Sequence, residues 1–252
     1  MNPFVLFYNE ILFNPLLNLL IGTTNVLPGH TIGWSIIIVT IIVRLILFPS
    51  SYHQAKVMQR NQGKMKALQD KLATAKAKHK DSPNKQAEET MRIYKEAGVN
   101  PASGCLPLLI QLPILIALYR VFLSGLSPEA LTGLYSFVSA PGQIDFAFFG
   151  INLQDPSLRL GVLAGIAQFI QMKYLSPTPP PSPSSGSDND AASMQASLQR
   201  NMSYIFPVMT IFFALQFPAA LSLYWFVSTL IGIGQQYLLK RSMHLSGNPI
   251  GV

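Results

Sequence analysis

Residues 34–48 read Trp-Ser-Ile-Ile-Ile-Val-Thr-Ile-Ile-Val-Arg-Leu-Ile-Leu-Phe, an apolar run interrupted by one charged side chain, Arg44. With its flanking residues the run is long enough to cross a bilayer, which takes about 20 residues. A guanidinium inside such a span costs on the order of 2.5–3.5 kcal/mol on insertion scales. Two interpretations therefore stand side by side. Either Arg44 snorkels to the nearby helix end at Pro49, or a hydrated site inside the membrane holds its charge.

The composition of the whole chain indicates a membrane protein. Hydrophobic residues make up 49% of the 252 residues and charged residues only 12%, about half the charged share of an average soluble domain. The net charge of +7 is concentrated, because 11 of the 18 Lys and Arg residues lie between Ser51 and Asn100. A general nucleic-acid-binding surface is therefore not expected. The single cysteine, Cys105, excludes an internal disulfide and a cysteine-based metal site.

Five apolar runs have the length of membrane-spanning helices and predict an all-α, polytopic membrane fold. The spans are expected at about 30–49, 104–123, 158–175, 202–217 and 219–238. The last two are divided at Pro218, because one helix over that length would exceed about 50 Å. Residues 101–175 would hold the second and third spans with the loop between them, and residues 201–240 the fourth and fifth.

The N-terminal segment, residues 1–29, differs from the spans. Apolar and polar residues alternate along it at helical spacing, and Pro15 argues against one clean span. We therefore expect an amphipathic helix that lies on the membrane surface. A signal sequence is the alternative, but no basic residues precede the apolar stretch.

The distribution of Lys and Arg predicts the orientation. Fifteen of these residues fall on one side of the predicted spans, and only Arg120 and Arg159 border the loop on the other side. This asymmetry places the N-terminus outside and the C-terminus in the cytosol. Because no transit peptide is recognisable, we expect a multi-pass protein of the bacterial plasma (inner) membrane.

Residues 50–100 are expected to form a basic helical hairpin in the cytosol. A coiled-coil-like seam runs along its first helix, at Met58, Asn61, Met65, Leu68, Leu72, Ala75 and His79. Residues 81–84 make the turn, Ala87, Met91 and Tyr94 are expected on one face of the second helix, and Gly98 ends that helix. The hairpin is either a solvated connector or a docking element for acidic headgroups or a partner.

Two further segments are expected on the cytosolic side. Residues 176–200 are rich in Pro and Ser and predict a flexible loop. Residues 241–252 are expected to form a short cytosolic tail.

Motifs of common enzyme classes are missing from the sequence. It contains no Gly-rich phosphate loop, no His-Glu-x-x-His pair and no Gly-x-Ser-x-Gly elbow. All four histidines lie at or beyond the ends of the predicted spans, whereas an intramembrane protease would need one inside the bilayer. We therefore expect a protein that is not an enzyme and that has no cofactor and no metal site.

Uncharged polar side chains inside the spans are the candidates for a site. Thr40 lies one helical turn before Arg44, on the same face of the first span. The others are Gln111 in the second span, Gln168 and Gln171 in the third, Gln216 closing the fourth, and Ser222, Tyr224, Ser228 and Thr229 in the fifth. Such groups either line a hydrated space with Arg44 or only hydrogen-bond neighbouring helices, as is common in membrane bundles.

Three stretches resemble the YidC family of membrane-protein insertases, which includes the mitochondrial Oxa and thylakoid Alb relatives. The most specific runs from Tyr94 to Arg120, with Gly-Val-Asn-Pro at 98–101 and Leu-Pro-Ile at 112–114. The others are Ile-Val-Arg-Leu at 42–45, followed by Pro49, and Phe-Pro-Ala-Ala-Leu-Ser-Leu-Tyr-Trp at 217–225. Order and spacing match the family from about residue 30 to residue 240.

The resemblance implies five core spans around a hydrophilic groove that contains Arg44, opens to the cytosol and the lipid, and is closed on the outer side. A short nascent membrane protein would place its polar outer segment in this groove, pair an acidic residue with Arg44, and then release its apolar helix into the lipid bilayer. The other residues expected to contact the substrate are Thr40, Gln111, Gln168, Gln171, Gln216, Ser222, Tyr224 and Trp225. Whether a Sec translocon, signal-recognition machinery or the ribosome assists is left open.

Two other classes of function fit the composition. A pore or proton-coupled transporter would use Arg44 as an anion or gating site, but the sequence shows no convincing internal repeat or matched broken helices. A structural assembly factor would only hold other membrane proteins by its hairpin. Reconstitution into liposomes separates the three, because only an insertase inserts a single-span substrate.

Overall fold

The structure, a computed structural model, describes residues 3–79, 82–99, 106–124, 132–175 and 204–245. Its α-helices are α1 (Pro3–Tyr8), α2 (Asn14–Val26), α3 (Ile32–Ile46), α4 (Phe48–Ala67), α5 (Gln69–Lys78), α6 (Pro83–Glu96), α7 (Leu106–Ser124), α9 (Leu158–Ile170), the helix Tyr204–Ala214, and α11 (Ala219–Leu245). Between them lie the π-helical turns η1 (Asn9–Phe13) and η4 (Gln171–Leu175) and the 3-10 turn η2 (Pro28–His30). The two strands in the described ranges, β1 (Ala147–Phe148) and β2 (Ile151–Asn152), form one short antiparallel hairpin. This mostly helical structure agrees with the predicted all-α class.

Each of the five predicted spans contains a helix, although not every helix is long. Within the described residues, Val5–Val26 is long and apolar enough to cross a membrane, and the pair Ile32–Ile46 and Phe48–Val57, bent by 55°, counts as a second candidate. Gln111–Leu123 and Tyr204–Ala214 are apolar but shorter. The number of spans therefore stays a prediction. The predicted flexible loop 176–200, the tail beyond residue 245 and Cys105 lie outside the described residues.

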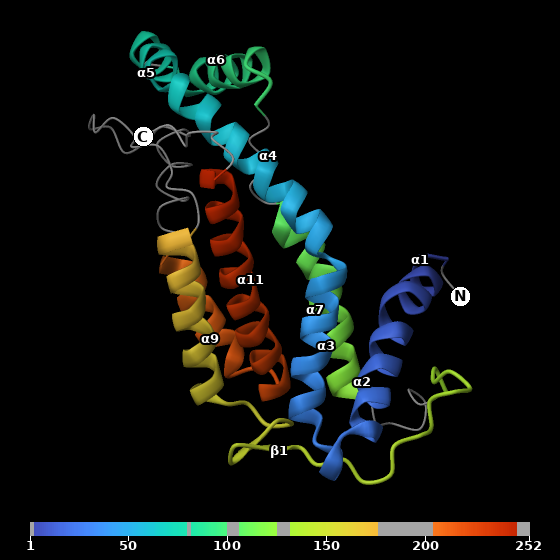
Figure 1. Cartoon of the computed structure of the whole chain (residues 1–252). Helices are drawn as coiled ribbons and strands as arrows, with labels where there is room; N and C mark the ends of the chain where they lie inside the picture. Colours follow the sequence, from blue (N-terminus) through green and yellow to red (C-terminus); the bar gives the residue numbers. More distant parts are fainter. Residues whose placement is uncertain (1–2, 80–81, 100–105, 125–131, 176–203, 246–252) are drawn as a thin grey trace.

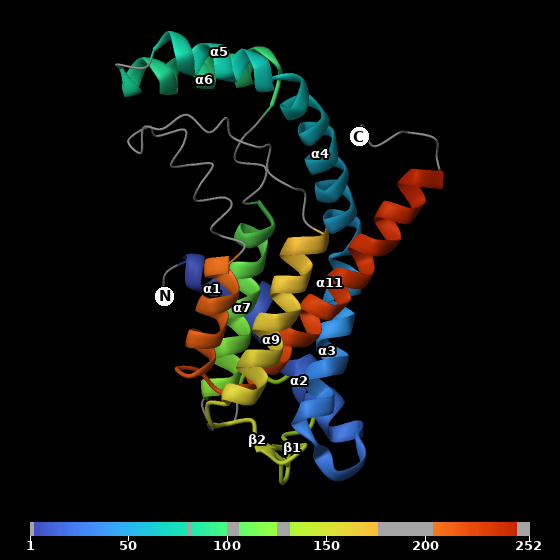
Figure 2. The same cartoon turned by 90° about the vertical axis from the view of Figure 1, so that its left-hand side faces the viewer.

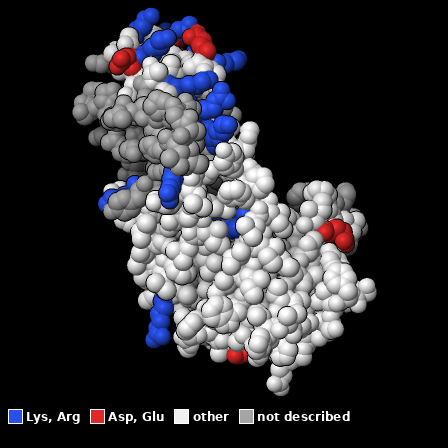
Figure 3. Space-filling view, viewed as in Figure 1, with Lys and Arg blue, Asp and Glu red and all other residues white. Residues whose placement is uncertain are grey.

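The helices form a bundle with one protruding arm. Figures 1 and 2 show α3 and α11 crossing in the bundle, with α9 beside α11, while α4 leaves the bundle and carries α5 and α6 at its far end. We call the arm α4–α6 the basic end, because Lys and Arg gather over it, whereas the bundle shows few charged side chains (Figure 3). The loop 132–157, with β1 and β2, lies at the opposite end of the bundle.

Small residues let α9 approach the helix Tyr204–Ala214 closely. A Cβ atom added at Gly161 would lie 2.4 Å from the Ala214 side chain, and one at Gly165 would lie 2.7 Å from Ile211. The two glycines are four residues apart, the spacing of the small-residue contact that packs helices in membranes. This contact places α9 and its polar residue Gln168 directly beside the last two helices.

The N-terminal helix is not interrupted at Pro15. Residues 3–26 form one helical run, and the wide π-turn η1, in which the Asn14 N–H bonds to the Asn9 carbonyl, directly precedes the proline. A widened turn can relieve the clash of a proline ring with the preceding turn. The expectation that Pro15 prevents a single long helix is therefore wrong. Leu17 and Leu20 are buried in the bundle core, and α2 packs against α3 and α7. The expected position of this helix on the membrane surface stays a prediction.

Backbone hydrogen bonds close the bundle at the loop 132–157. The first N–H groups of α11, at Ala219 and Ala220, donate to the carbonyls of Asp155 (2.9 Å) and Leu153 (3.0 Å). Helix starts have such unpaired donors, so the loop satisfies them and fills the space above the core. Leu153 itself is fully buried. From the other side the Asn18 amide donates to the Gly133 carbonyl at 2.9 Å.

The arm folds back on itself at its far end. Leu68, Ala75, Ile93 and Val99 form a small apolar cluster between α5 and α6. Gly98 adopts a φ of +61°, and the hydrogen bonds from Gly98 N to Lys95 O (3.1 Å) and from Val99 N to Tyr94 O (2.9 Å) make a Schellman C-cap. The predicted helix stop at Gly98 is confirmed.

The face of α6 that carries Ala87, Met91 and Tyr94 packs on the apolar cluster only at Tyr94. Tyr94 packs against the cluster, but Ala87 is exposed and the Met91 side chain is 57% exposed. Ile93 is buried in their place, because the turn at Gly98 brings Val99 back into the same cluster. That contact determines which side of α6 faces α5, and the spacing of apolar residues along α6 does not show it.

Candidate functional site

One face of α11 carries the polar groups that meet the rest of the bundle. Tyr224, Ser228, Gly232 and Gln235 recur at intervals of three or four residues and therefore share a face of the helix. This face is directed toward α3, α7 and η4, because each of its four members contacts or closely approaches a residue of those elements.

Arg44 is bound to this face by a hydroxyl group. Its Nε and Nη2 atoms donate to Ser228 Oγ at 2.8 and 2.6 Å, and Ser228 is only 3% exposed. Among the described residues no carboxylate oxygen lies within 4.0 Å of the Arg44 guanidinium. The side chain is therefore oriented into the bundle while its positive charge has no anionic partner there.

Because Gly232 has no side chain, the amide of Gln171 can lie near the Arg44 guanidinium. A Cβ atom at Gly232 would lie 2.6 Å from Gln171 Nε2 and 3.9 Å from Arg44 Nη1. The amide of Gln171 and Nη1 of Arg44 therefore both lie beside Gly232, where α11 has no side chain. Gln171 opens the π-turn η4, and π-turns change the direction in which side chains leave a helix.

Tyr224 joins the second predicted span to this face. The amide Nε2 of Gln111, on α7, donates to the Tyr224 hydroxyl, and Tyr224 is 3% exposed. Tyr224 lies one helical turn before Ser228. The structure therefore brings Gln111, Tyr224, Gln171 and Arg44 to one face of α11, and a shared substrate site there stays a prediction.

Thr40 is buried near Arg44 but bonds elsewhere. Its hydroxyl donates to the carbonyl of Ile36 at 2.6 Å, one turn back on the same helix. Hydroxyls of Ser and Thr inside helices commonly bond in this way. Thr40 therefore contributes a small, satisfied side chain at this position.

Gln168, on α9, bonds to Trp225, which lies beside the polar face of α11. The Gln168 carbonyl oxygen accepts from Trp225 Nε1 at 2.8 Å and from Thr210 Oγ1 at 3.0 Å. These bonds join α9, the helix Tyr204–Ala214 and α11 in a buried contact. The structure does not bring Gln168 or Trp225 to Arg44, and it supports the alternative that such groups hold helices together.

Gln216 and Ser222 lie toward the start of α11, away from the guanidinium. Gln216 is exposed in the turn before α11, and Ser222 is buried one and a half turns before Ser228. A distance of six residues corresponds to about 9 Å along the helix. Neither residue shares the site with Arg44.

Sequence reasoning named Ser228 only as an inward-facing polar residue and did not assign Gly232 or Gln235 to the site. The side-chain amide of Gln235 donates to the Arg44 carbonyl at 3.5 Å, which joins the end of α3 to α11. Their spacing from Tyr224 was the available signal. In the described ranges no group of three or more His, Cys, Asp or Glu residues is placed to hold a metal ion.

Comparison with known proteins identifies the family. The family model described as 60Kd inner membrane protein matches residues 24–246. The chain is 36% identical to the membrane protein insertase YidC of Fusobacterium nucleatum, over 91% of this chain and 96% of that protein. It is 34% identical to the membrane protein insertase MisCA of Bacillus subtilis, over 93% of this chain and 79% of that protein.

Longer relatives match over a part of their length. The YidC insertase of Ectopseudomonas mendocina is 36% identical over 86% of this chain, which spans 32% of that protein. These relatives are named insertases, in agreement with a function that is not enzymatic. The polar face described above lies within the matched region, and the chain belongs to the YidC family of membrane protein insertases.

Proposed function

We propose that this protein is an insertase that receives the polar outer segment of a short nascent membrane protein beside Arg44 and releases the substrate's apolar helix into the bilayer. The observation that carries the proposal is the state of the guanidinium, which Ser228 orients by two hydrogen bonds without neutralising it. Gln171, Gln111 and Tyr224 would complete the polar wall against which the segment lies. Gln168 and Trp225 would hold the surrounding helices in place.

The charge of Arg44 supplies selectivity for acidic segments. Attraction between opposite charges is stronger where the effective dielectric constant is below that of water. A carboxylate of the substrate would accept hydrogen bonds from the guanidinium in place of the Ser228 hydroxyl, since charge-assisted bonds are the stronger ones. The hydroxyl would take its place again when the segment leaves, so the guanidinium keeps a hydrogen-bond acceptor at every stage.

The two ends of the bundle differ in a way that sets the direction of entry. Loop 132–157 is bonded to the start of α11 and to α2, whereas the opposite end carries the basic arm. We place the basic end in the cytosol and the loop outside, which puts the N-terminus outside and the C-terminus inside. The five spans then enclose a groove that is open at the basic end. Partition of the apolar helix into lipid and the membrane potential would drive release.

The basic end is the surface we assign to cytosolic partners. Its Lys and Arg side chains suit anionic headgroups, and a Sec translocon, signal-recognition machinery or the ribosome are candidate partners there. None of these is needed for the charge-pairing step itself.

The test uses purified protein in liposomes and two single-span substrates, one with an acidic outer tail and one with the same tail carrying Asn and Gln. Arg44→Ala should slow insertion of the acidic substrate about tenfold or more, since hydrogen bonds to charged groups contribute about 1.5–3 kcal/mol. The amide-tailed substrate should be little affected, and Arg44→Lys should retain much of the activity because the charge remains. A wild-type rate for the acidic substrate with folded, correctly oriented Arg44→Ala protein would refute charge pairing.

The same liposomes test the rival function. A pore or proton-coupled transporter that uses Arg44 as an anion or gating site would release a trapped anion or proton gradient without any substrate protein. Such release, lost in Arg44→Ala, would replace the insertase proposal.

A further inference from the structure

The hairpin β1–β2 ends in an unusual turn. Phe148 pairs with Ile151, so the two residues between them, Phe149 and Gly150, make the whole loop. Both have positive φ values, +47° and +72°. Positive φ at both central positions defines a type I′ turn, whose first position is normally Asn, Asp or Gly. A phenylalanine there is strained, because its Cβ crowds the backbone in the left-handed region.

Contacts within the protein do not account for this strain. The Phe149 side chain is 79% exposed. Its ring touches the edges of the Phe148 ring, at 4.7 Å between centroids, and of the Trp34 ring, at 6.3 Å. Strained residues persist where the surrounding structure holds them, and they often mark a function. The strained turn therefore exposes an aromatic ring on the surface of the protein.

The neighbours of Phe149 hold this presentation rigid. Phe148 is 9% exposed and packs on α3 so closely that a Cβ atom at Gly33 would lie 2.2 Å from its ring. Phe148 thereby fixes the hairpin to the first turn of α3. Trp34, in the same turn of α3, is 48% exposed and stands beside the Phe149 ring.

The exposed face of α3 indicates what covers these rings. Ile41 and Leu45 continue from Trp34 at helical spacing, and they are 41% and 63% exposed. In a predicted membrane span, such a row of exposed apolar side chains faces the acyl chains. Trp34 is the first member of this row and also contacts Phe148 and Phe149 of the hairpin. The hairpin lies at the end of the bundle opposite the basic arm (Figure 1). Aromatic side chains are favoured at such a boundary between headgroups and acyl chains.

We infer that Phe149 and Trp34 form an aromatic anchor that inserts into the outer leaflet at the boundary between lipid headgroups and acyl chains. The anchor goes beyond the substrate site and rests only on the proposed membrane orientation. It would fix the depth and tilt of α3, and with them the depth of Arg44, which lies ten residues further along the same helix.

The test measures depth and needs no substrate. The chain contains two tryptophans, so Trp225→Phe leaves Trp34 as the only one. This variant is placed in phosphatidylcholine and phosphatidylglycerol vesicles whose acyl chains carry bromine either near the headgroup or near the chain end. Bromine near the headgroup should quench Trp34 about twofold more strongly than bromine near the chain end.

Phe149→Gly then removes the ring and suits the turn better, so loss of the fold is not expected. Quenching near the headgroup should fall and Trp34 emission should shift to the red. Phe149→Asn, which also suits the turn, should behave in the same way. Phe137→Ala is the matched control, because Phe137 is 81% exposed in the same loop but packs on Tyr135.

Equal quenching at both depths, no quenching at all, or an unchanged profile in Phe149→Gly and Phe149→Asn would overturn the anchor. Each of these outcomes would leave the charge-pairing proposal untouched, since that proposal is tested by insertion rates alone.

Discussion

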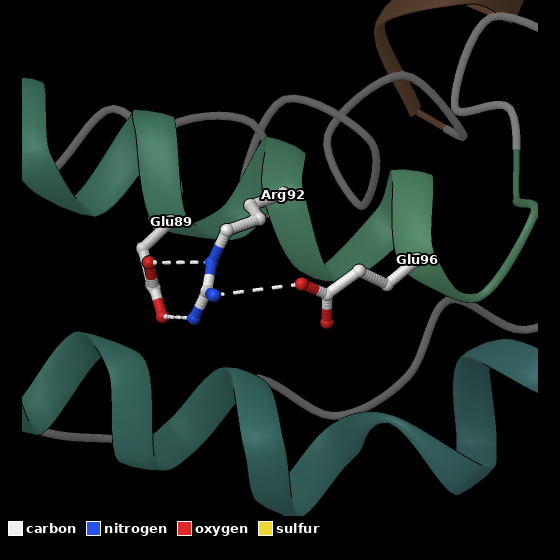
Figure 4. A network of polar contacts seen from close by, with 3 residues as sticks. All are labelled: Glu89, Arg92 and Glu96. Carbon is white, nitrogen blue, oxygen red and sulfur yellow. Dashed lines mark hydrogen bonds and ion pairs between the residues drawn. The ribbon is translucent and has the colours of Figure 1, made fainter.

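Arg92 in the arm and Arg44 in the bundle carry the same charge under opposite conditions. Arg92 is 61% exposed and has a carboxylate one turn away on each side of its own helix, Glu89 and Glu96 (Figure 4). Arg44 lies in the bundle, where a carboxylate partner would be far more effective, and is given the hydroxyl of Ser228. Exposed ion pairs contribute little to stability, so the carboxylate partners of Arg92 lie where they stabilise the protein least. In the bundle Ser228 orients the guanidinium of Arg44 and leaves its charge unneutralised, as a site for an acidic ligand requires.

The largest effect is expected when Arg44 is given a carboxylate partner within the bundle. In Ser228→Asp the new carboxylate replaces the acceptor of the Nε and Nη2 bonds and neutralises the charge within the bundle. We expect thermal stability to be kept and insertion of the acidic-tailed substrate to fall about tenfold or more, the equivalent of about 1.4 kcal/mol. Rates in liposomes and unfolding in detergent measure the two effects.

Ser228→Asn is the control for size and polarity, because it adds an amide and no charge. It should lose clearly less activity than Ser228→Asp. If both variants insert the acidic substrate equally well, the free charge of Arg44 is not what the substrate uses.

A second variant sharpens the difference between polar groups that hold helices and polar groups that bind. Gln168→Leu removes the acceptor of Trp225 Nε1 and Thr210 Oγ1. The Thr210 hydroxyl keeps the Phe206 carbonyl as an acceptor at 3.0 Å, so Trp225 Nε1 is the donor that loses its acceptor, and an unsatisfied donor costs about 1–3 kcal/mol. We expect a lower Tm and an equal loss of insertion for acidic and amide-tailed substrates.

Gln236→Leu is the matched control on α11. The buried side-chain oxygen of Gln236 has no hydrogen-bond partner among the described residues, so the same substitution should not lower Tm there. A loss confined to acidic substrates in Gln168→Leu would instead place Gln168 in the binding site.

A smaller effect is expected from crowding the guanidinium without touching its bonds to Ser228. In Gly232→Ala the new methyl group displaces Gln171 Nε2, 2.6 Å away, and approaches Arg44 Nη1, 3.9 Å away. Insertion of the acidic substrate should slow by a few-fold, about 1 kcal/mol or less. Gly234→Ala is the control, because nothing lies within 4 Å of a Cβ atom there. Equal rates for the two variants would mean that Gln171 is not needed beside Arg44.

The smallest effect is expected from removing the exposed ion pair of Arg92 and Glu89. The hydrogen bond from Arg92 lowers the pKa of Glu89 below its ordinary value of 4.5. A carboxyl whose pKa is lowered by folding stabilises the protein above its unfolded pKa, and this stabilisation is lost as the pH falls through the folded value. Between pH 6 and pH 3 the Tm of wild-type protein should therefore fall slightly more than that of Glu89→Gln. Insertion at neutral pH should be unchanged within about twofold, and a larger loss would show that the pair has a role beyond the arm.

The sequence predicts the helices well and their contacts poorly, for a physical reason. Long apolar runs locate α3, α7 and α11, and Gly98 predicts the end of α6. In a membrane span, however, almost every face is apolar, so the pattern does not show which side of a helix meets which neighbour. The partner of Arg44 was therefore not predictable, and neither were the bonds of Gln168 to Trp225 and Thr210.

Arg44 and Tyr224 were grouped from the sequence for the opposite reason. A charge or a hydroxyl inside a span is costly, so it must turn toward other polar groups. The turn at Pro15 shows the limit of local rules, because a π-turn, which depends on the packing of Phe13 and Leu16 in the core, allows a helix that the proline alone would forbid.

The bond between Arg44 and Ser228 also concerns how the protein itself is made, because it joins residues 184 positions apart. At 5–20 residues per second, Ser228 leaves the ribosome on the order of 10–40 s after Arg44. Until Ser228 has been made, Arg44 lacks this hydroxyl, and in the proposed orientation its guanidinium would reach for the cytosolic surface instead. Snorkelling and the inward contact would then be two successive states of the same side chain.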